Sequence, residues 1–134
     1  MKIDGACHCG NIRYEAEVDP QAVAICHCTD CQTLSGSAFR TVVPAKKENF
    51  RLLKGAPKTY VKTAESGNPR VQAFCPECGT PIYSAAPGDA PAFSLRVGTI
   101  RQRAELRPQK QLWSRSALEW LKELPGVKRL EKQS

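Results

Sequence analysis

Seven cysteines in three clusters constrain this 134-residue chain more than any other feature. The clusters are Cys7 with Cys9, Cys26 with Cys28 and Cys31, and Cys75 with Cys78. Clustered thiols in a chain that shows no secretory leader are more often metal ligands than disulfide partners, because reducing compartments keep thiols free. We therefore expect a fold built around metal ions, with zinc as the metal that such thiolate sets favour.

Ligand counting divides the seven thiols between two ions. A structural zinc site takes four protein ligands and is closed, whereas a catalytic zinc site takes three and keeps a fourth position for water or substrate. One site of each kind would use every cysteine of the chain. The count therefore predicts two zinc ions per chain, one structural and one open.

Spacing indicates which cysteines share an ion. Side chains at i and i+2 of an extended segment point to one face, so Cys7 and Cys9 can reach the same metal. Cys75 and Cys78 have the two-residue gap of a zinc knuckle, which needs a second pair of ligands. We expect Cys7 and Cys9 to be that second pair. The remaining three-cysteine cluster would then form the open site.

Other interpretations of these residues remain open. The alternation that groups the cysteines turns His8 and His27 away from the metal, so neither is expected to be a ligand. The Cys75–Cys78 pair could instead be a redox motif, although no βαβ pattern surrounds it. The second ion could also be structural, closed by a fourth ligand that the sequence does not identify.

Alternating apolar and polar residues predict a mainly β fold. Strands are expected at 11–18, 22–25, 38–43, 50–53, 59–62, 70–74 and 93–97, and one helical turn at 29–34. Pro44 is expected to end the third strand, because proline cannot donate a ladder hydrogen bond. Glycine and proline at 54–57 predict a turn, and hence a hairpin that joins 50–53 to 59–62.

The C-terminal tail has a different pattern. A helix is predicted from about residue 114, capped by a serine and ended by a Pro-Gly pair, and it would carry Leu118, Leu121 and Leu124. Trp113 and Trp120 are expected to pack over the sheet, because both have large apolar surfaces.

Length and composition bound the organisation and the partners. We predict a single domain over 1–134, with a core at about 3–113 and a C-terminal extension at 114–134. The formal charge of +7 would fall to +4 with seven zinc-bound thiolates and two divalent ions. Lys and Arg are scattered without interleaved aromatics, so nucleic acid is not the expected partner. No membrane span or signal peptide is recognised, so the cytoplasm is the expected location.

Three segments together resemble a known family. They are Gly-Ala-Cys-His-Cys-Gly at 5–10, the three-cysteine cluster at 26–31 followed by Ser-Gly-Ser-Ala-Phe at 35–39, and Phe-Cys-Pro-Glu-Cys-Gly-Thr-Pro at 74–81. With these motifs the chain resembles, over about its first hundred residues, the glutathione-dependent formaldehyde-activating enzyme family, which is also named for centromere protein V. Gln32 is a departure, because many relatives are expected to carry a basic residue there.

The resemblance implies a mainly β, Mss4-like fold with two zinc ions. It implies a structural zinc held by Cys7, Cys9, Cys75 and Cys78, and a catalytic zinc held by Cys26, Cys28 and Cys31. The family's named activity, a carbon–sulfur lyase reaction, joins formaldehyde to glutathione and gives S-(hydroxymethyl)glutathione. A small thiol and a small aldehyde are therefore the expected partners.

Residues and resemblance together predict an enzyme. A thiolate bound at the open zinc would add to the aldehyde, and backbone N–H groups at 35–37 would stabilise the developing oxyanion. The alternative is a non-catalytic, zinc-stabilised binding module that uses its basic surface on nucleic acid or an acidic partner.

Overall fold

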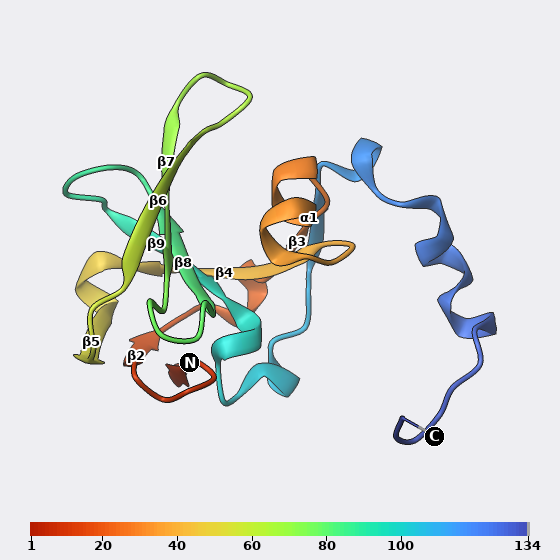
Figure 1. Cartoon of the computed structure of the whole chain (residues 1–134), viewed down its shortest axis with the longest axis horizontal. Coiled ribbons are helices and arrows are strands. Elements are labelled where there is room, and N and C mark those ends of the chain that lie inside the picture. Colours follow the sequence, from red (N-terminus) through yellow and green to blue (C-terminus); the bar gives the residue numbers. More distant parts are fainter. Residues whose placement is uncertain (134) are drawn as a thin grey trace.

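Two β-sheets and several short helices make up residues 1–133, the part of the chain that this computed structural model describes (Figure 1). The smaller sheet has the order β1–β2–β5, formed by Lys2–Ala6, Arg13–Glu17 and Phe50–Lys54. The larger sheet has the order β10–β3–β4–β9–β8–β7–β6. In that order its strands are Lys110–Leu112, Ala24–Cys26, Arg40–Lys46, Ala92–Arg96, Pro81–Ala85, Pro69–Phe74 and Lys58–Thr63. Ser134, which ends the predicted extension, lies outside the described residues.

The helices are short. The α-helix α1 covers Thr29–Ser35 and ends at Gly36, whose backbone is left-handed with φ of 64°. The 3-10 helices η1 to η6 cover Pro20–Ala22, Lys47–Asn49, Val97–Thr99, Arg103–Glu105, Ser114–Ser116 and Glu119–Gly126. Within residues 1–133, none of these helices has the length and apolar character that a membrane span requires.

The core lies between the two sheets. Tyr14 and Phe50 from the smaller sheet meet Tyr83 and Phe93 from the larger one, with ring centroids 4.8 to 5.7 Å apart. Such aromatic pairs add about 0.5–1.5 kcal/mol each beyond the area that they bury. The aromatic cluster therefore helps to hold one sheet against the other.

The prediction of a mainly β fold is confirmed. Each of the seven predicted strands overlaps a strand of the structure, from β2 to β7 and β9. The sequence reasoning missed β1, β8 and β10. The last of these is exposed along its whole length and pairs in parallel with β3, so it has no alternating pattern to detect.

The prediction that Pro44 ends its strand is wrong, because β4 continues through Pro44 to Lys46. The ladder explains why proline is tolerated at this position. β3 pairs with β4 only as far as Val42, so at Pro44 only β9 continues as a hydrogen-bonded neighbour. One side of β4 therefore has no ladder at this position for a proline to interrupt.

The prediction of a hairpin between 50–53 and 59–62 is also wrong. β5 pairs with β2, whereas β6 pairs with β7, so the turn at 54–57 carries the chain from one sheet to the other. Gly55 permits this change of direction, because its φ is 82° and a Cβ there would lie 2.3 Å from the Asn11 carbonyl oxygen.

The predicted tail helix forms as two 3-10 segments, η5 and η6, with extended backbone at Ala117 and Leu118 between them. The leucines at 118, 121 and 124 have the period of three that a 3-10 helix aligns. Trp113 and Trp120 do not cover the sheet, because they are 41% and 49% exposed and the tail extends away from the sheets (Figure 1). Trp113 instead contacts Arg115, whose guanidinium lies 4.9 Å from the ring centroid.

Candidate metal centres

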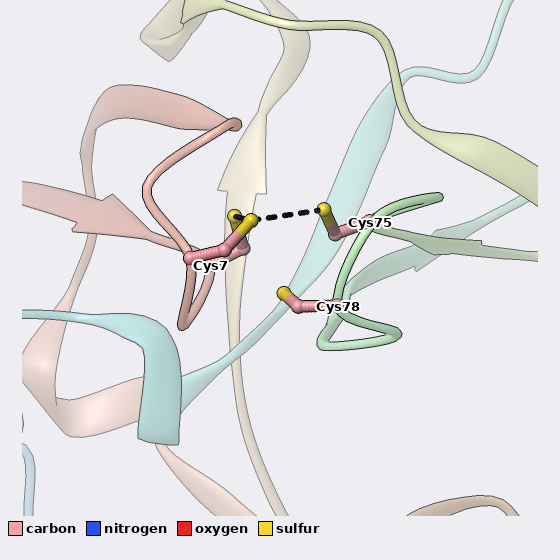
Figure 2. Close-up of side chains that lie close together, drawn as sticks. Cys7, Cys75 and Cys78 are labelled. Carbon is pink, nitrogen blue, oxygen red and sulfur yellow. Dashed lines mark hydrogen bonds between the residues drawn. The ribbon is translucent and has the colours of Figure 1, made fainter.

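Four cysteines meet where two loops approach each other. Cys7 and Cys9 lie between β1 and β2, and Cys75 and Cys78 lie between β7 and β8. Figure 2 shows the side chains of the two loops pointing toward one another. The four Sγ atoms lie within 4.8 Å of one another, with 3.6 Å between Cys7 and Cys9 and 3.8 Å between Cys9 and Cys75. Zn–S bonds of about 2.3 Å place tetrahedral sulfurs about 3.8 Å apart, so this cluster fits a zinc ion.

Backbone N–H groups donate to the sulfurs of this cluster. The N–H of Ile12 lies 3.2 Å from Cys7 Sγ, and the N–H of Glu77 lies 3.4 Å from Cys75 Sγ. The hydroxyl of Thr80 lies 3.1 Å from Cys78 Sγ and lowers the pKa of that thiol to about 5. These donors stabilise thiolates, which is the form that binds a metal.

The second centre is formed where β3 meets α1. Cys26 is the last residue of β3, Cys28 caps α1, and Cys31 lies in the first turn of that helix. Their Sγ atoms also lie within 4.8 Å of one another, and no fourth His, Cys, Asp or Glu atom of residues 1–133 joins the group. Cys26 is buried, whereas Cys28 and Cys31 are partly exposed. The arrangement fits a metal with three protein ligands and one position left for another molecule.

The thiols of the second centre differ in acidity. Burial raises the pKa of Cys31 to about 12. Burial also opposes ionisation of Cys28, but the Cys31 N–H, the neighbouring thiols and the charge of Lys62 outweigh it, so the pKa of Cys28 is lowered. Lys62 is held in place by Asp30, with 2.9 Å between Nζ and Oδ2. Cys28 is therefore the first thiol of this cluster to ionise.

The two histidines lie outside both sulfur clusters, as the alternation indicated. His8 is exposed, and its N–H donates to Thr80 Oγ1 at 3.1 Å, which links the two loops of the four-cysteine centre. His27 is buried, and its Nε2 lies 2.7 Å from Gln111 Oε1 on β10. Its side chain therefore joins β10 to the start of α1 rather than holding a metal.

Gln32 has a positioning role that sequence reasoning missed. Its Nε2 donates to the carbonyl of His27 at 2.8 Å and to the carbonyl of Ser116 at 3.0 Å. It thus ties the helix that carries Cys31 to the segment between Cys26 and Cys28, and to the tail. These contacts depend on the three-dimensional position of Gln32, so its polarity alone could not predict them.

The N–H groups at 35–37 were predicted to stabilise an oxyanion, and for Gly36 and Ser37 this prediction is wrong. The N–H of Gly36 donates to the carbonyl of Thr33 at 3.2 Å, and the N–H of Ser37 donates to the carbonyl of Gln32 at 3.2 Å. Both groups close the C-terminus of α1, so neither is available to a substrate.

Comparisons with known proteins show which family the chain is similar to. A family model described as glutathione-dependent formaldehyde-activating enzyme matches residues 2–116. An uncharacterised lyase of Schizosaccharomyces pombe is 28% identical over 86 residues, which cover 61% of this chain and 56% of the relative. The chain therefore spans about half the length of that curated relative.

A crystal structure of a Rhodobacter sphaeroides protein from structural genomics has a similar fold. Its TM-score is 0.62 at 18% sequence identity, and the match covers 81% of this chain and 98% of that one. At this identity the likeness concerns the fold alone. Together with the family match, it supports the predicted Mss4-like architecture.

Proposed function

The chain belongs to the glutathione-dependent formaldehyde-activating enzyme family, and we propose that it is a zinc-dependent enzyme of the carbon–sulfur lyase type. In this proposal a small, glutathione-like thiol adds to formaldehyde or another small aldehyde at the centre of Cys26, Cys28 and Cys31. The lyase name of the Schizosaccharomyces pombe relative supports the reaction class. The substrates, the zinc identity and the cytoplasmic location belong to the proposal.

The number of donors at the second centre carries this proposal. Within residues 1–133, three sulfurs converge there without a fourth His, Cys, Asp or Glu atom, whereas the first centre has a full set of four. A closed centre can only stabilise the fold, but a three-ligand centre can accept a substrate atom. The partial exposure of Cys28 and Cys31 supports access from solvent.

The three thiolate ligands of this centre make a thiol the expected substrate. Zinc bound there would act as a Lewis acid that favours a soft sulfur ligand. The substrate thiol loses its proton, and its sulfur forms a bond to the carbonyl carbon. The C=O π pair moves to the oxygen, which takes up the released proton. Lys62 places a positive charge near Cys28, and Gln32 keeps α1 in position against the end of β3.

The test consists of three measurements on the wild type and on one variant. Wild-type protein should contain two zinc ions per chain and accelerate hemithioacetal formation, whereas Cys28→Ser should retain one zinc, remain folded and lose the acceleration. Metal analysis, circular dichroism and the rate of aldehyde consumption measure the three properties. A reaction without protein is the control, because uncatalysed addition is fast. An unchanged rate in Cys28→Ser would contradict the proposal.

A binding module remains the competing outcome. Glutathione that raises the melting temperature of wild type but not of Cys28→Ser supports the enzyme. Salt-sensitive DNA binding with no acceleration of hemithioacetal formation supports the module instead.

A further inference from the structure

Two arginines lie beside the three-cysteine centre on one face of the larger sheet. Arg40 on β4 is the register partner of Cys26 on β3, and Arg96 on β9 is the partner of Val42. Directly paired residues, and residues two apart on one strand, share a face of a sheet. Cys26, Arg40 and Arg96 therefore point to the same side of the sheet.

Both arginines are buried without an acidic partner. Arg40 is 6% exposed and Arg96 is 8% exposed, and neither forms a salt bridge within residues 1–133. Their guanidinium groups share one neutral acceptor, Gln72 Oε1, which lies 3.3 Å from Arg40 Nη1 and 2.9 Å from Arg96 Nη2. Among the residues that the structure describes, the buried Nε of Arg96 has no hydrogen-bond partner. A buried charge in this state is costly unless another group compensates it.

The charge persists at neutral pH. Burial, together with the neighbouring charge of Arg40, lowers the pKa of Arg96 to about 9, which is still well above 7. Three thiolates around a divalent ion would carry a single negative charge. The two guanidinium groups therefore exceed that centre by one positive charge before the nearby charge of Arg70 is added, and a bound anion would offset this excess.

A cavity opens onto the two arginines. Its volume is about 350 Å³, and Arg40, Arg96 and Gln72 form its polar part. Leu34, Phe74, Tyr60 and Pro81 contribute its apolar and aromatic walls. Leu34 lies three residues after Cys31 on α1, so the two side chains share one face of that helix. None of the three cysteines lines the cavity, but it lies one residue away from them, through Leu34 on the helix and through Arg40 on the sheet.

We propose that Arg40 and Arg96 bind a carboxylate of the substrate in this cavity, so that the reacting thiol or aldehyde belongs to a small organic acid. Guanidinium groups bind carboxylates with paired, charge-assisted hydrogen bonds. The aromatic walls accept the apolar body of the acid, and its reactive end then faces the three-cysteine centre. This inference rests on the proposed function for the reaction, but not for the binding.

Calorimetric titration of the zinc-loaded full chain tests the binding with two probes, 3-phenylpropionate and its neutral amide. Neither probe has a thiol or an aldehyde, so binding is independent of the lyase reaction. The acid should bind at least about tenfold more tightly than the amide. Arg96→Met and Arg40→Met should each abolish this preference. Arg51→Met is the control for loss of an arginine, because Arg51 pairs with Glu15 on the smaller sheet and does not line the cavity.

Melting temperatures separate ligand binding from a purely structural role. Without ligand, Arg96→Met should melt at or above the temperature of wild type, because it removes a buried charge that has no acidic partner. Equal binding of acid and amide by wild type would overturn the inference at any melting temperature, and a lower melting temperature of Arg96→Met would then assign the arginine a purely structural role. Arg96→Lys is the second variant, and it should lose most of the preference because it lacks the guanidinium fork.

Tyr60→Ala provides a variant that should fold normally, since Tyr60 is 56% exposed. It should weaken binding of the acid and of the amide alike, because it removes an apolar wall and leaves the arginines in place. If wild-type protein prefers the acid but shows no lyase activity, only the proposed function is contradicted. Equal binding of acid and amide would contradict this inference and leave the lyase proposal standing.

Discussion

At the scale of single residues, Tyr14 shows how the core depends on one satisfied hydroxyl. It is the largest fully buried side chain, and its hydroxyl lies 2.6 Å from Thr99 Oγ1. Thr99 Oγ1 donates to the carbonyl of Arg96 at 2.8 Å, so the tyrosine hydroxyl donates to Thr99. Burial raises the pKa of Tyr14 to about 12. The neutral phenol is thus the form that the fold requires.

The raised pKa predicts a loss of stability in alkali. Between pH 10.0 and about 12 the unfolded tyrosine is ionised while the folded one stays protonated. The free energy of unfolding should therefore fall by up to about 1.4 kcal/mol per pH unit from this group. Tyr14→Phe should lose about 1 kcal/mol at pH 7 but lack the alkaline decline. Urea unfolding from pH 7 to 11.5 measures both, and a wild-type-to-variant difference that stays constant with pH would contradict the assignment.

At the scale of elements, the pairing of β1 with β2 depends on a glycine. Gly5 is the register partner of Tyr14, and the tyrosine ring occupies the space where a side chain on Gly5 would lie. A Cβ at Gly5 would approach Tyr14 Cζ to 2.3 Å. The glycine is required here for the close approach of the ring to the strand.

Gly5→Ala should therefore destabilise the protein by about 1–3 kcal/mol or more, because the buried ring has to move. Thermal or urea unfolding measures the change. Gly98→Ala is the matched control, since a Cβ at Gly98 meets nothing within 4 Å. Equal stability of the two alanine variants would show that β1 can shift to accommodate the methyl group.

At the scale of the whole molecule, the four-cysteine centre joins the two sheets. The loop of Cys7 and Cys9 connects strands of the smaller sheet, and the loop of Cys75 and Cys78 connects strands of the larger sheet. An ion bound between them would link parts of the chain that are far apart in sequence. Structural zinc of this kind contributes directly to folding free energy.

Removal of this ion should unfold the protein far more readily than loss of the second ion. Cys78→Ser should lower the free energy of unfolding by several kcal/mol, whereas Cys28→Ser should change it much less. Chelator-induced unfolding, followed by circular dichroism together with zinc release, measures both. If the two variants unfold alike, the division into a structural and an open centre is wrong.

The sequence by itself determined the mainly β character and the grouping of the cysteines. Strand periodicity and ligand spacing are local, so Cys75 and Cys78 could be identified as a knuckle and β2 or β7 as a strand without any partner. The structure brings the seven thiols into the two groups that spacing and ligand counting predicted. The turn at 54–57 was predicted correctly as well, but the sequence did not show how the strands on either side of it pair.

Only the tertiary structure decided which strands pair and which polar side chains converge. A strand's pattern tells which residues share a face, but its partners are chosen by backbone hydrogen bonds and packing across the whole chain. For this reason β5 pairs with β2 instead of forming the expected hairpin, and β4 continues through Pro44. For the same reason Arg40 and Arg96, 56 positions apart, share Gln72 beside the sulfur centre.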